Sequence, residues 1–180
     1  MTGNGQQQTP QRLGKGMIVI AWILLLVLLT WFFNDQLDQQ RNPNRQLNST
    51  VSTDSIPMVQ LERNRFGHYV ATGAINGHPV EFMLDTGATD VSIPATVADK
   101  LGLKRGRRVY YQTANGTIAA YQTTLDEIQL GPLRLGPVRA SINPNVGTDA
   151  ILLGMSFLKE LDFNQQGNTL TLKYAQPGRP

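Results

Sequence analysis

Short apolar or alternating segments, separated by turn residues, make up most of the chain after residue 60. Segments of this kind predict β-strands that each give one face to a core. Two pairs of predicted strands flank an Asn-Gly dipeptide, which favours a type I′ hairpin turn. These pairs are Tyr69–Ile75 with Pro79–Leu84, around Asn76-Gly77, and Val109–Ala114 with Thr117–Tyr121, around Asn115-Gly116.

The same pattern predicts further strands and two short helices. The remaining strands are Thr124–Leu130, Leu133–Ile142 (one strand or two), Ala150–Leu153, Leu161–Phe163 and Thr169–Lys173. The helices are Pro94–Leu101, with proline at a first-turn position, and a turn or two within Met155–Lys159. We therefore predict an all-β domain over residues 61–180, a small barrel or sandwich with one or two short helices.

A continuous apolar run lies near the amino terminus. Met17–Phe33 contains no charge, and Thr30 is its only polar residue. As a helix it would measure about 26 Å, near the lower limit for crossing a bilayer core. A cleaved signal peptide is the alternative, but the small residues of a cleavage site do not follow the run. We expect a transmembrane anchor over residues 17–33, after a short tail over residues 1–16.

Residues 34–60 are rich in Gln, Asn and Ser and show no apolar period. Such a composition does not bury enough surface to offset the entropy of ordering the chain. We therefore expect a flexible linker between the anchor and the domain. Lys15 is the cation closest to the apolar run, which favours an amino terminus on the cytoplasmic side and the domain on the other side.

Charge and composition exclude several functions. The chain has 16 lysines and arginines against 13 acidic residues, and two of the cations, Arg12 and Lys15, precede the apolar run. The remainder is nearly neutral, so we expect no nucleic-acid partner. The chain has no cysteine, which excludes a thiol nucleophile, a disulfide framework and a cysteine-based metal site. His68 and His78 alone do not make a metal site, and we expect no metal or cofactor.

One carboxylate stands out from this background. Asp85 directly follows the apolar strand Val80–Leu84, a place from which a charge is usually excluded unless it is used. Thr86 then offers a hydroxyl, and Gly87 lets the chain turn sharply. The alternative is local, because an Asp side chain also caps turns. We expect Asp85 to be catalytic.

The sequence repeats this arrangement without the carboxylate. An apolar strand, a glycine and a short helix occur first around Asp85 and again at Ala150–Gly154, where Leu152, Leu153 and Gly154 form an apolar-apolar-Gly motif. Leu84-Asp85-Thr86-Gly87-Ala88, followed about 65 residues later by this second motif, resembles the retroviral-type (retropepsin-like) aspartic proteases. With the amino-terminal anchor and the run Leu152–Leu158, the resemblance is greatest to a bacterial membrane-anchored branch. It covers roughly residues 61–174.

The resemblance implies a small closed barrel in which Asp85 is catalytic and Thr86 and Gly87 support its loop. Two carboxylates then share one water: the ionised one takes its proton while the protonated one polarises the scissile carbonyl. Aspartic proteases are the established example of such a pair, whose two carboxyls titrate as a unit. Since the chain has one Asp-Thr-Gly, the resemblance implies a homodimer that contributes one Asp85 from each subunit.

Other residues receive a role from the same resemblance. The hairpin around Asn115-Gly116 matches the family's flap in order, and would close over an extended protein or peptide substrate. The predicted substrate or loop contacts are Ala88, Asp90, Asn115 and Gly116, with Asp90 equally suited to accept hydrogen bonds within the loop. Thr89 and Met155-Ser156 replace the Asp and Arg-Asn of the retroviral enzymes, whose dimer-stabilising ion pair is therefore missing.

The sequence thus predicts a membrane-anchored aspartic endopeptidase of a bacterial inner membrane, with its domain in the periplasm. A non-catalytic peptide-binding module on the same fold is the alternative. A phosphotransfer site that uses Asp85 as nucleophile is disfavoured, because the strand pattern offers neither a Mg²⁺ site nor a parallel α/β frame. The cationic cluster Lys104–Arg108 is interpreted as a solvated loop, with contact to anionic lipid or an acidic substrate as the alternative. Asp149 is interpreted as a turn residue.

Overall fold

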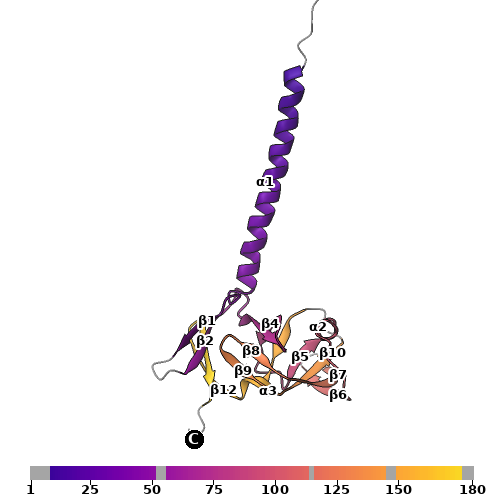
Figure 1. Ribbon diagram of the computed structural model, residues 1–180, viewed down its shortest axis with the longest axis vertical. Coiled ribbons are helices and arrows are strands. Elements are labelled where there is room, and N and C mark those ends of the chain that lie inside the picture. The colour runs from indigo at the N-terminus through magenta and orange to yellow at the C-terminus, as the bar shows by residue number, and fades with distance from the viewer. Residues whose placement is uncertain (1–8, 52–55, 114–115, 145–148, 176–180) are drawn as a thin grey trace, which may run out of the picture. The chain divides into compact units, whose positions relative to one another are not determined.

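Figure 1 presents a computed structural model of the chain, which describes residues 9–51, 56–113, 116–144 and 149–175. The helices are α1 (Thr9–Arg41), α2 (Ala95–Lys100) and α3 (Met155–Leu158). The strands are β1 (Asn48–Val51), β2 (Pro57–Glu62), β3 (Val70–Ile75), β4 (His78–Leu84), β5 (Val91–Pro94), β6 (Arg108–Thr113), β7 (Gly116–Leu125), β8 (Ile128–Leu130), β9 (Leu133–Leu135), β10 (Val138–Asn143), β11 (Ile151–Leu153), β12 (Leu161–Gln166) and β13 (Thr169–Tyr174). Contacts divide the chain after Gln39 into two units, which are described separately.

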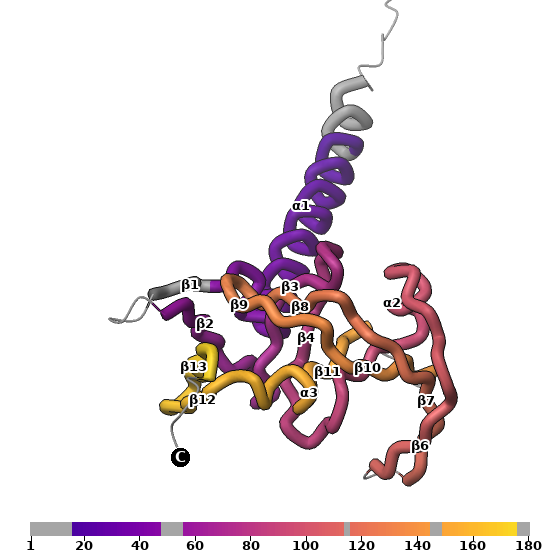
Figure 2. The backbone as a smooth tube through the Cα atoms, turned by 60° about the horizontal axis from the view of Figure 1, so that its bottom comes forward, coloured from indigo at the N-terminus to yellow at the C-terminus, as the bar shows by residue number. Residues whose placement is uncertain are grey.

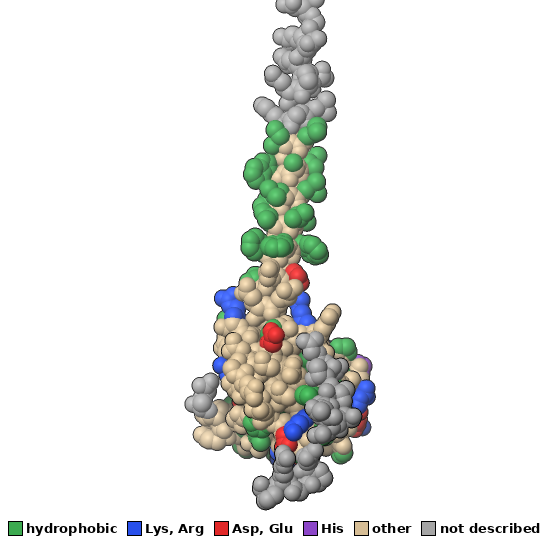
Figure 3. Space-filling view, turned by 90° about the vertical axis from the view of Figure 1, so that its left-hand side faces the viewer, with side chains coloured by type: hydrophobic (Ala, Val, Ile, Leu, Met, Phe, Trp, Pro, Cys, Tyr) green, Lys and Arg blue, Asp and Glu red, His purple; other side chains and the backbone are tan. Residues whose placement is uncertain are grey.

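The first unit contains most of α1, which extends beyond the predicted anchor at both ends. Over Gly16–Arg41 this helix is long and apolar enough to cross a membrane, a property that a signal sequence near an amino terminus shares. Hydrophobic side chains lie on both flanks of the described helix in Figure 3, and Trp22 is 61% exposed. Thr30 Oγ1 donates a hydrogen bond to Leu26 O at 2.8 Å, so the polar group of the run is satisfied within the helix.

The second unit, from Gln40 onward, is built mostly of β-strands, as predicted. One sheet has nine strands in the order β6-β7-β10-β5-β11-β4-β3-β8-β9, and the other has four in the order β1-β2-β13-β12. In Figure 2 the β6–β7 hairpin and β9 lie at opposite ends of the larger sheet. The hydrophobic core of this unit includes the fully buried side chains of Phe82, Ile93, Ile142, Leu153 and Phe157.

The hairpin predictions are confirmed in their strands. β3 pairs with β4 in antiparallel fashion, and the connecting Asn76 and Gly77 have φ angles of 50° and 80°. Positive φ at both positions is the signature of a type I′ turn. β6 pairs with β7 as predicted, but the tip, which includes Asn115, lies outside the described residues.

One predicted strand is wrong, and β5 was missed within the region predicted to be the domain. Thr124–Leu130 is divided between β7 and β8, because the backbone of Glu127 exchanges hydrogen bonds with Asn76 rather than with a sheet partner. β5 was not predicted, since its four residues follow the Asp85 loop directly and end at Pro94, the N-cap of α2. Leu133–Ile142 forms two strands, β9 and β10.

The predicted linker over residues 34–60 is also wrong. α1 continues to Arg41, β1 and β2 follow, and the compact unit begins at Gln40 rather than at residue 61. Asn44 is 4% exposed; its side-chain amide donates to Glu62 O and Val70 O, and its Oδ1 accepts from Glu62 N at 2.7 Å. Asn42 donates to Thr72 and Glu81 side chains. The composition argument failed because these polar amides bind backbone groups inside the domain instead of water.

Candidate active site

Asp85 stands at the end of β4, directly beside the second apolar-apolar-Gly motif. β4 and β11 pair in parallel, with Met83 opposite Leu152 and Leu84 opposite Leu153. The pairing continues for one more bond, because Asp85 N donates to Leu153 O at 3.2 Å. The structure therefore brings together the two motifs that the sequence repeats about 65 residues apart.

The Asp85 loop is organised by its own carboxylate. Gly87 N donates to Asp85 Oδ1 at 2.9 Å, and Ala88 N donates to Asp85 O at 3.2 Å. Asp85 is half-buried, whereas Thr86 and Gly87 are exposed. Within the described residues no protein donor reaches Oδ2 of Asp85. The side chain thus caps a turn, as the local alternative predicts, and still keeps one oxygen for a water or a substrate.

The residues that follow the Leu152-Leu153-Gly154 motif donate backbone hydrogen bonds to the Asp85 loop. Met155 N donates to Ala88 O at 2.8 Å, and Ser156 N donates to Thr89 O at 2.9 Å. A Cβ atom on Gly154 would lie 2.6 Å from Ala88 O and would also overlap the carbonyl oxygen of Asp90. Only glycine permits this close backbone approach at residue 154. Leu152, Leu153 and Gly154 therefore fix the position of the loop rather than contribute a reactive group.

The side chain of Ser156 adds two hydrogen bonds to this contact between the second motif and the Asp85 loop. Its Oγ accepts a hydrogen bond from Val91 N at 3.0 Å and donates one to Arg139 O at 2.7 Å. These bonds link the start of β5, the start of β10 and the first turn of α3. The sequence marked residue 156 only as a departure from the retroviral pattern, and did not reveal this role.

Asp90 accepts hydrogen bonds inside the domain. Its side chain is 6% exposed, and its Oδ1 and Oδ2 accept from Arg139 Nε at 2.7 Å and from the Tyr111 hydroxyl at 2.6 Å. Of the two predicted roles for Asp90, substrate contact and internal acceptor, this geometry matches the second. A buried carboxylate with two charge-assisted hydrogen bonds is a strongly fixed group.

The pKa values of both partners reflect this carboxylate. Burial, followed by the hydrogen bond and the negative charge of Asp90, raises the pKa of Tyr111 from 10.0 to about 12. A hydrogen bond with Ser141 and the charge of Arg139 oppose that rise. The hydrogen bond and charge of Asp90 also raise the pKa of Arg139. Tyr111 is therefore a neutral hydrogen-bond donor across the physiological pH range.

Tyr111 belongs to β6, in the hairpin that corresponds to the predicted flap. Its neighbour Tyr110 is 67% exposed, with the Arg108 guanidinium 5.4 Å from its ring centroid. Gly116 begins β7 on the other side of the hairpin, and its carbonyl accepts from Thr113 Oγ1 at 2.7 Å. Asn115 lies outside the described residues. Successive side chains of a β-strand point to opposite faces, so Tyr110 and Tyr111 must face opposite sides of the hairpin. This alternation is the sequence signal that could have identified Tyr111.

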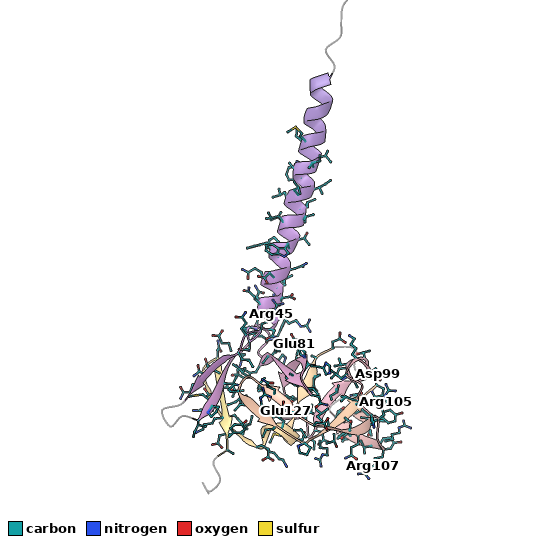
Figure 4. All side chains as sticks on the ribbon, in the orientation of Figure 1. Arg45, Glu81, Asp99, Arg105, Arg107 and Glu127 are labelled. Atoms are coloured by element: carbon teal, nitrogen blue, oxygen red, sulfur yellow. The ribbon has the colours of Figure 1, made fainter. Side chains whose placement is uncertain are left out.

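The charged loop after α2 agrees with its interpretation as a solvated loop. Arg105 Nη2 donates to both carboxylate oxygens of Asp99, at 2.7 and 2.9 Å, and the two residues lie side by side in Figure 4. Arg107 Nε donates to Gln122 Oε1 at 2.9 Å. The side chains of Asp99, Arg105 and Arg107 are exposed, and Gln122 is half-buried. Asp149, also exposed, accepts from Thr96 Oγ1 at 3.3 Å.

A groove of about 490 Å³ borders the Asp85 loop, and Thr89, Pro137, Arg139, Ser156 and Lys159 are among its lining residues. In the part of the chain that the structure describes, no cluster of three His, Cys, Asp or Glu side chains is placed to hold a metal ion. The site thus presents the carboxylate of Asp85 on a loop that hydrogen bonds from β11 and α3 hold in place.

Comparison with known proteins gives one matching family, two relatives and one similar solved structure. Residues 71–160, which include both motifs, match the family described as "gag-polyprotein putative aspartyl protease". An uncharacterized protein from the cobV 5′ region of Sinorhizobium sp is 30% identical, over 92% of this chain and 76% of its own length. An uncharacterized protein of Rickettsia prowazekii is 31% identical, over 64% of this chain and 51% of its own. The crystal structure of a retropepsin-like aspartic protease from Rickettsia conorii is 29% identical, with a TM-score of 0.56 over 72% of this chain and 96% of its own.

Proposed function

The chain belongs to the retropepsin-like aspartyl protease family, and from this premise we propose that it is an aspartic endopeptidase that uses Asp85 from each of two chains. The observation that supports the proposal most directly is the state of the Asp85 carboxylate. One of its oxygens is fixed by Gly87 N, and the carboxylate is half-buried on a loop braced by β11 and α3. A group held in this way is oriented before a substrate arrives.

The chemistry requires a second carboxylate beside the first. In the ionised state one Asp85 removes a proton from a water, while the protonated Asp85 of the other chain hydrogen-bonds the scissile carbonyl oxygen. The water then attacks the carbonyl carbon, and the carbonyl oxygen takes the proton of the second Asp85. When the C–N bond breaks, the first Asp85 gives its proton to the leaving nitrogen, and the second Asp85 recovers its own from the oxygen. Aspartic proteases are the established example of one proton shared by two close carboxyls, so the pair has no separate pKa values for its members.

We propose that two chains meet about a two-fold axis at this loop. Thr86, Gly87 and Thr89 are exposed around Asp85, so the loop is accessible to a second copy. Thr86 would then donate a hydrogen bond across the axis. The ion pair of Asp90 with Arg139 forms within one chain and adds nothing to the interface. We therefore expect a weak dimer.

Anchoring would compensate for weak dimerisation. We propose that α1 crosses the bacterial inner membrane with its amino terminus in the cytoplasm, so that the domain faces the periplasm. The helix over Gly16–Arg41 has the length and composition for this role, and the relatives above are bacterial. Confinement to one surface raises the local concentration of chains, and with it the fraction that is paired.

The substrate of the proposed enzyme is a protein or peptide in extended conformation. β6 has only β7 as a sheet neighbour among the described strands, so this hairpin ends the larger sheet on the side that would cover the site. An extended peptide would lie between the hairpin and the Asp85 loop, with Ala88, Asn115 and Gly116 as backbone contacts. No cofactor is needed.

The proposal is tested with the full chain in detergent and an unfolded protein as substrate, from acid to neutral pH. Asp85→Asn should lower the cleavage rate by about 10²-fold or more, because the general acid–base pair is lost. Asp126→Asn is the matched control, since Asp126 is an exposed carboxylate with no side-chain partner among the described residues. Equal cleavage by the wild type and Asp85→Asn would refute the catalytic role. Peptide binding without cleavage by the wild-type dimer would instead identify a binding module.

Mixing wild-type and Asp85→Asn chains tests the dimer separately. A mixed pair has only one carboxylate and should be inactive, so an about ninefold excess of the variant should lower wild-type activity about tenfold once subunits exchange. Activity that is unchanged in the mixture would show that one chain suffices.

A further inference from the structure

Asp90 joins the active-site loop to the flap hairpin. It lies five positions after Asp85, at the end of the loop and directly before β5. Its carboxylate is buried and accepts one hydrogen bond from Arg139 and one from the Tyr111 hydroxyl. Tyr111 is contributed by β6, which the hydrogen-bond pairing places at the end of the larger sheet, far from β4 in strand order.

The carboxylate is fixed on the side of the active-site loop. Arg139 holds Oδ1 at 2.7 Å, and its own carbonyl oxygen accepts from Ser156 Oγ at 2.7 Å. The same hydroxyl accepts from Val91 N, the residue after Asp90. Asp90 is therefore restrained through both its side chain and its neighbouring backbone, and it does not move independently of the loop.

The flap strand has few other restraints. Among the described strands, β6 pairs only with β7, and its side chains at Arg108, Tyr110, Gln112 and Thr113 are exposed. Tyr111 is the residue of β6 whose side chain reaches the loop, at 2.6 Å from Asp90 Oδ2. The Ser141 hydroxyl on β10 also interacts with the phenol oxygen as a donor, an interaction that lowers the pKa of Tyr111. The Tyr111 side chain thus hydrogen-bonds the flap strand to the active-site loop.

We propose that Tyr111 and Asp90 form a latch that fixes the flap relative to the Asp85 loop, and that both are positioning residues for peptide binding. This inference rests on the proposed function. With the latch closed, the flap is already ordered when an extended peptide enters beneath it. Without the latch, the peptide must order β6 as it binds, and that entropic cost lowers its affinity. Asp90 acts through Tyr111 rather than by contact with the substrate.

The chemistry of Tyr111 and Asp90 suits a latch that does not depend on pH, rather than a pH switch. A phenol that donates to a buried carboxylate makes a short, charge-assisted hydrogen bond. The pKa of Tyr111 is about 12, so the phenol keeps its proton at every pH at which the protein is expected to act. Arg139 keeps the carboxylate paired when the Tyr111 bond opens, so that opening leaves no isolated buried charge.

The latch is tested by amide hydrogen exchange on the full chain in detergent, which does not depend on activity. Tyr111→Phe should speed exchange across β6 by about tenfold or more, since a hydrogen bond to a charged group restrains local opening. Tyr110→Phe is the matched control, because it removes the same atom from the adjacent, exposed position. Exchange that is as slow in Tyr111→Phe as in the control would overturn the latch.

A second variant and a kinetic measurement complete the test. Asp90→Asn keeps an oxygen acceptor but loses the charge, so its exchange should lie between those of the wild type and Tyr111→Phe. With a peptide that the wild type cleaves, Tyr111→Phe should raise KM several-fold with kcat within about twofold, as expected for lost binding alone. A fall in kcat at unchanged KM would overturn the positioning role. If no chain cleaves any peptide, the proposed function fails, while the exchange rates still decide the latch.

Discussion

The Asp85 motif after β4 and the Leu152-Leu153-Gly154 motif of β11 lie side by side, but the loops that follow them have different roles. After β4, the chain turns through a partly exposed loop in which Gly87 N donates a hydrogen bond to the carboxylate of Asp85. After β11, it turns through Gly154 into α3, and backbone amides there bond to the carbonyl oxygens of the first loop. One loop presents a functional group, and the other holds it in place.

The difference shows how a reactive carboxylate is kept both accessible and rigid. The Asp85 loop makes few contacts on its exposed side, so the second motif must restrain it from behind. Gly154 allows the two backbones to approach, and Ser156 locks the contact with two further hydrogen bonds. A side chain at residue 154 would overlap the backbone of the first loop, so the second motif can restrain that loop only with glycine at this position.

The largest effect should come from the glycine that separates the two loops. Gly154→Ala should lower the free energy of unfolding by about 3 kcal/mol, because its Cβ would overlap the carbonyl oxygens of Ala88 and Asp90. Gly87→Ala should cost less than about 1 kcal/mol, since the atom near its Cβ is Asp85 Oδ1, at 3.2 Å. Urea denaturation followed by the near-ultraviolet circular dichroism of tyrosine measures both. Equal losses would contradict the asymmetry between the motifs.

Removing the hydroxyl of Ser156 should have the next largest effect on the free energy of unfolding. Ser156→Ala removes two hydrogen bonds and leaves Val91 N without an acceptor, so we expect a loss of about 2 kcal/mol in unfolding free energy. Ser92→Ala serves as the control, because the Ser92 hydroxyl has no partner within the described part of the chain. The same denaturation measurement applies. A loss in the Ser156 variant no larger than in the control would mean that backbone contacts alone hold the loop.

Alkaline pH should lower the free energy of unfolding, because it removes the proton that Tyr111 donates to Asp90 at the end of the Asp85 loop. The pKa of Tyr111 in the folded domain, about 12, exceeds its ordinary value of 10.0, so the folded state keeps a proton that the unfolded chain releases. The stabilisation is complete below pH 10 and is lost as the pH rises from 10 to 12. Since the phenol is partly exposed, we expect a loss of no more than about 1 kcal/mol. Unfolding in urea at pH 9 and pH 11.5 should show this loss in the wild type and not in Tyr111→Phe.

The smallest effect concerns the turn that Asp85 itself forms. Asp85→Asn keeps a side-chain oxygen for Gly87 N and should change the unfolding free energy by less than about 0.5 kcal/mol, whereas Asp85→Ala should cost about 1 kcal/mol. Thermal unfolding of the two variants beside the wild type measures the difference. If Asp85→Ala were as stable as Asp85→Asn, the carboxylate would not organise its own loop.

Local patterns in the sequence predicted much of this domain. Alternation and the Asn-Gly dipeptide located β3, β4, β6 and β7, and the turn at Asn76 and Gly77 has the predicted dihedral angles. The repeat of an apolar strand and a glycine predicted that Leu153 and Asp85 belong to equivalent motifs. The structure pairs the two strands in parallel, with Leu84 opposite Leu153.

The residues that sequence reasoning missed act over long distances in the chain. Arg139 stands 49 positions from Asp90, and nothing in its own strand distinguishes it from a solvated cation. Asn44 has the composition of a linker, yet it is buried because three backbone groups satisfy its amide. Polar residues of this kind take their roles from partners that only the folded chain brings near, so local pattern does not identify them.

The parallel pairing of β4 with β11 also determines when the site is complete during synthesis. The backbone groups that hold the Asp85 loop belong to Leu153, Met155 and Ser156, about 70 residues further along the chain. At a translation rate of about 5–20 residues per second, these residues emerge several seconds after the loop itself. A nascent chain therefore holds the Asp85 carboxylate on an unsupported turn while these roughly 70 residues are made. The proposed protease would become competent only after Leu153, Met155 and Ser156 have left the ribosome.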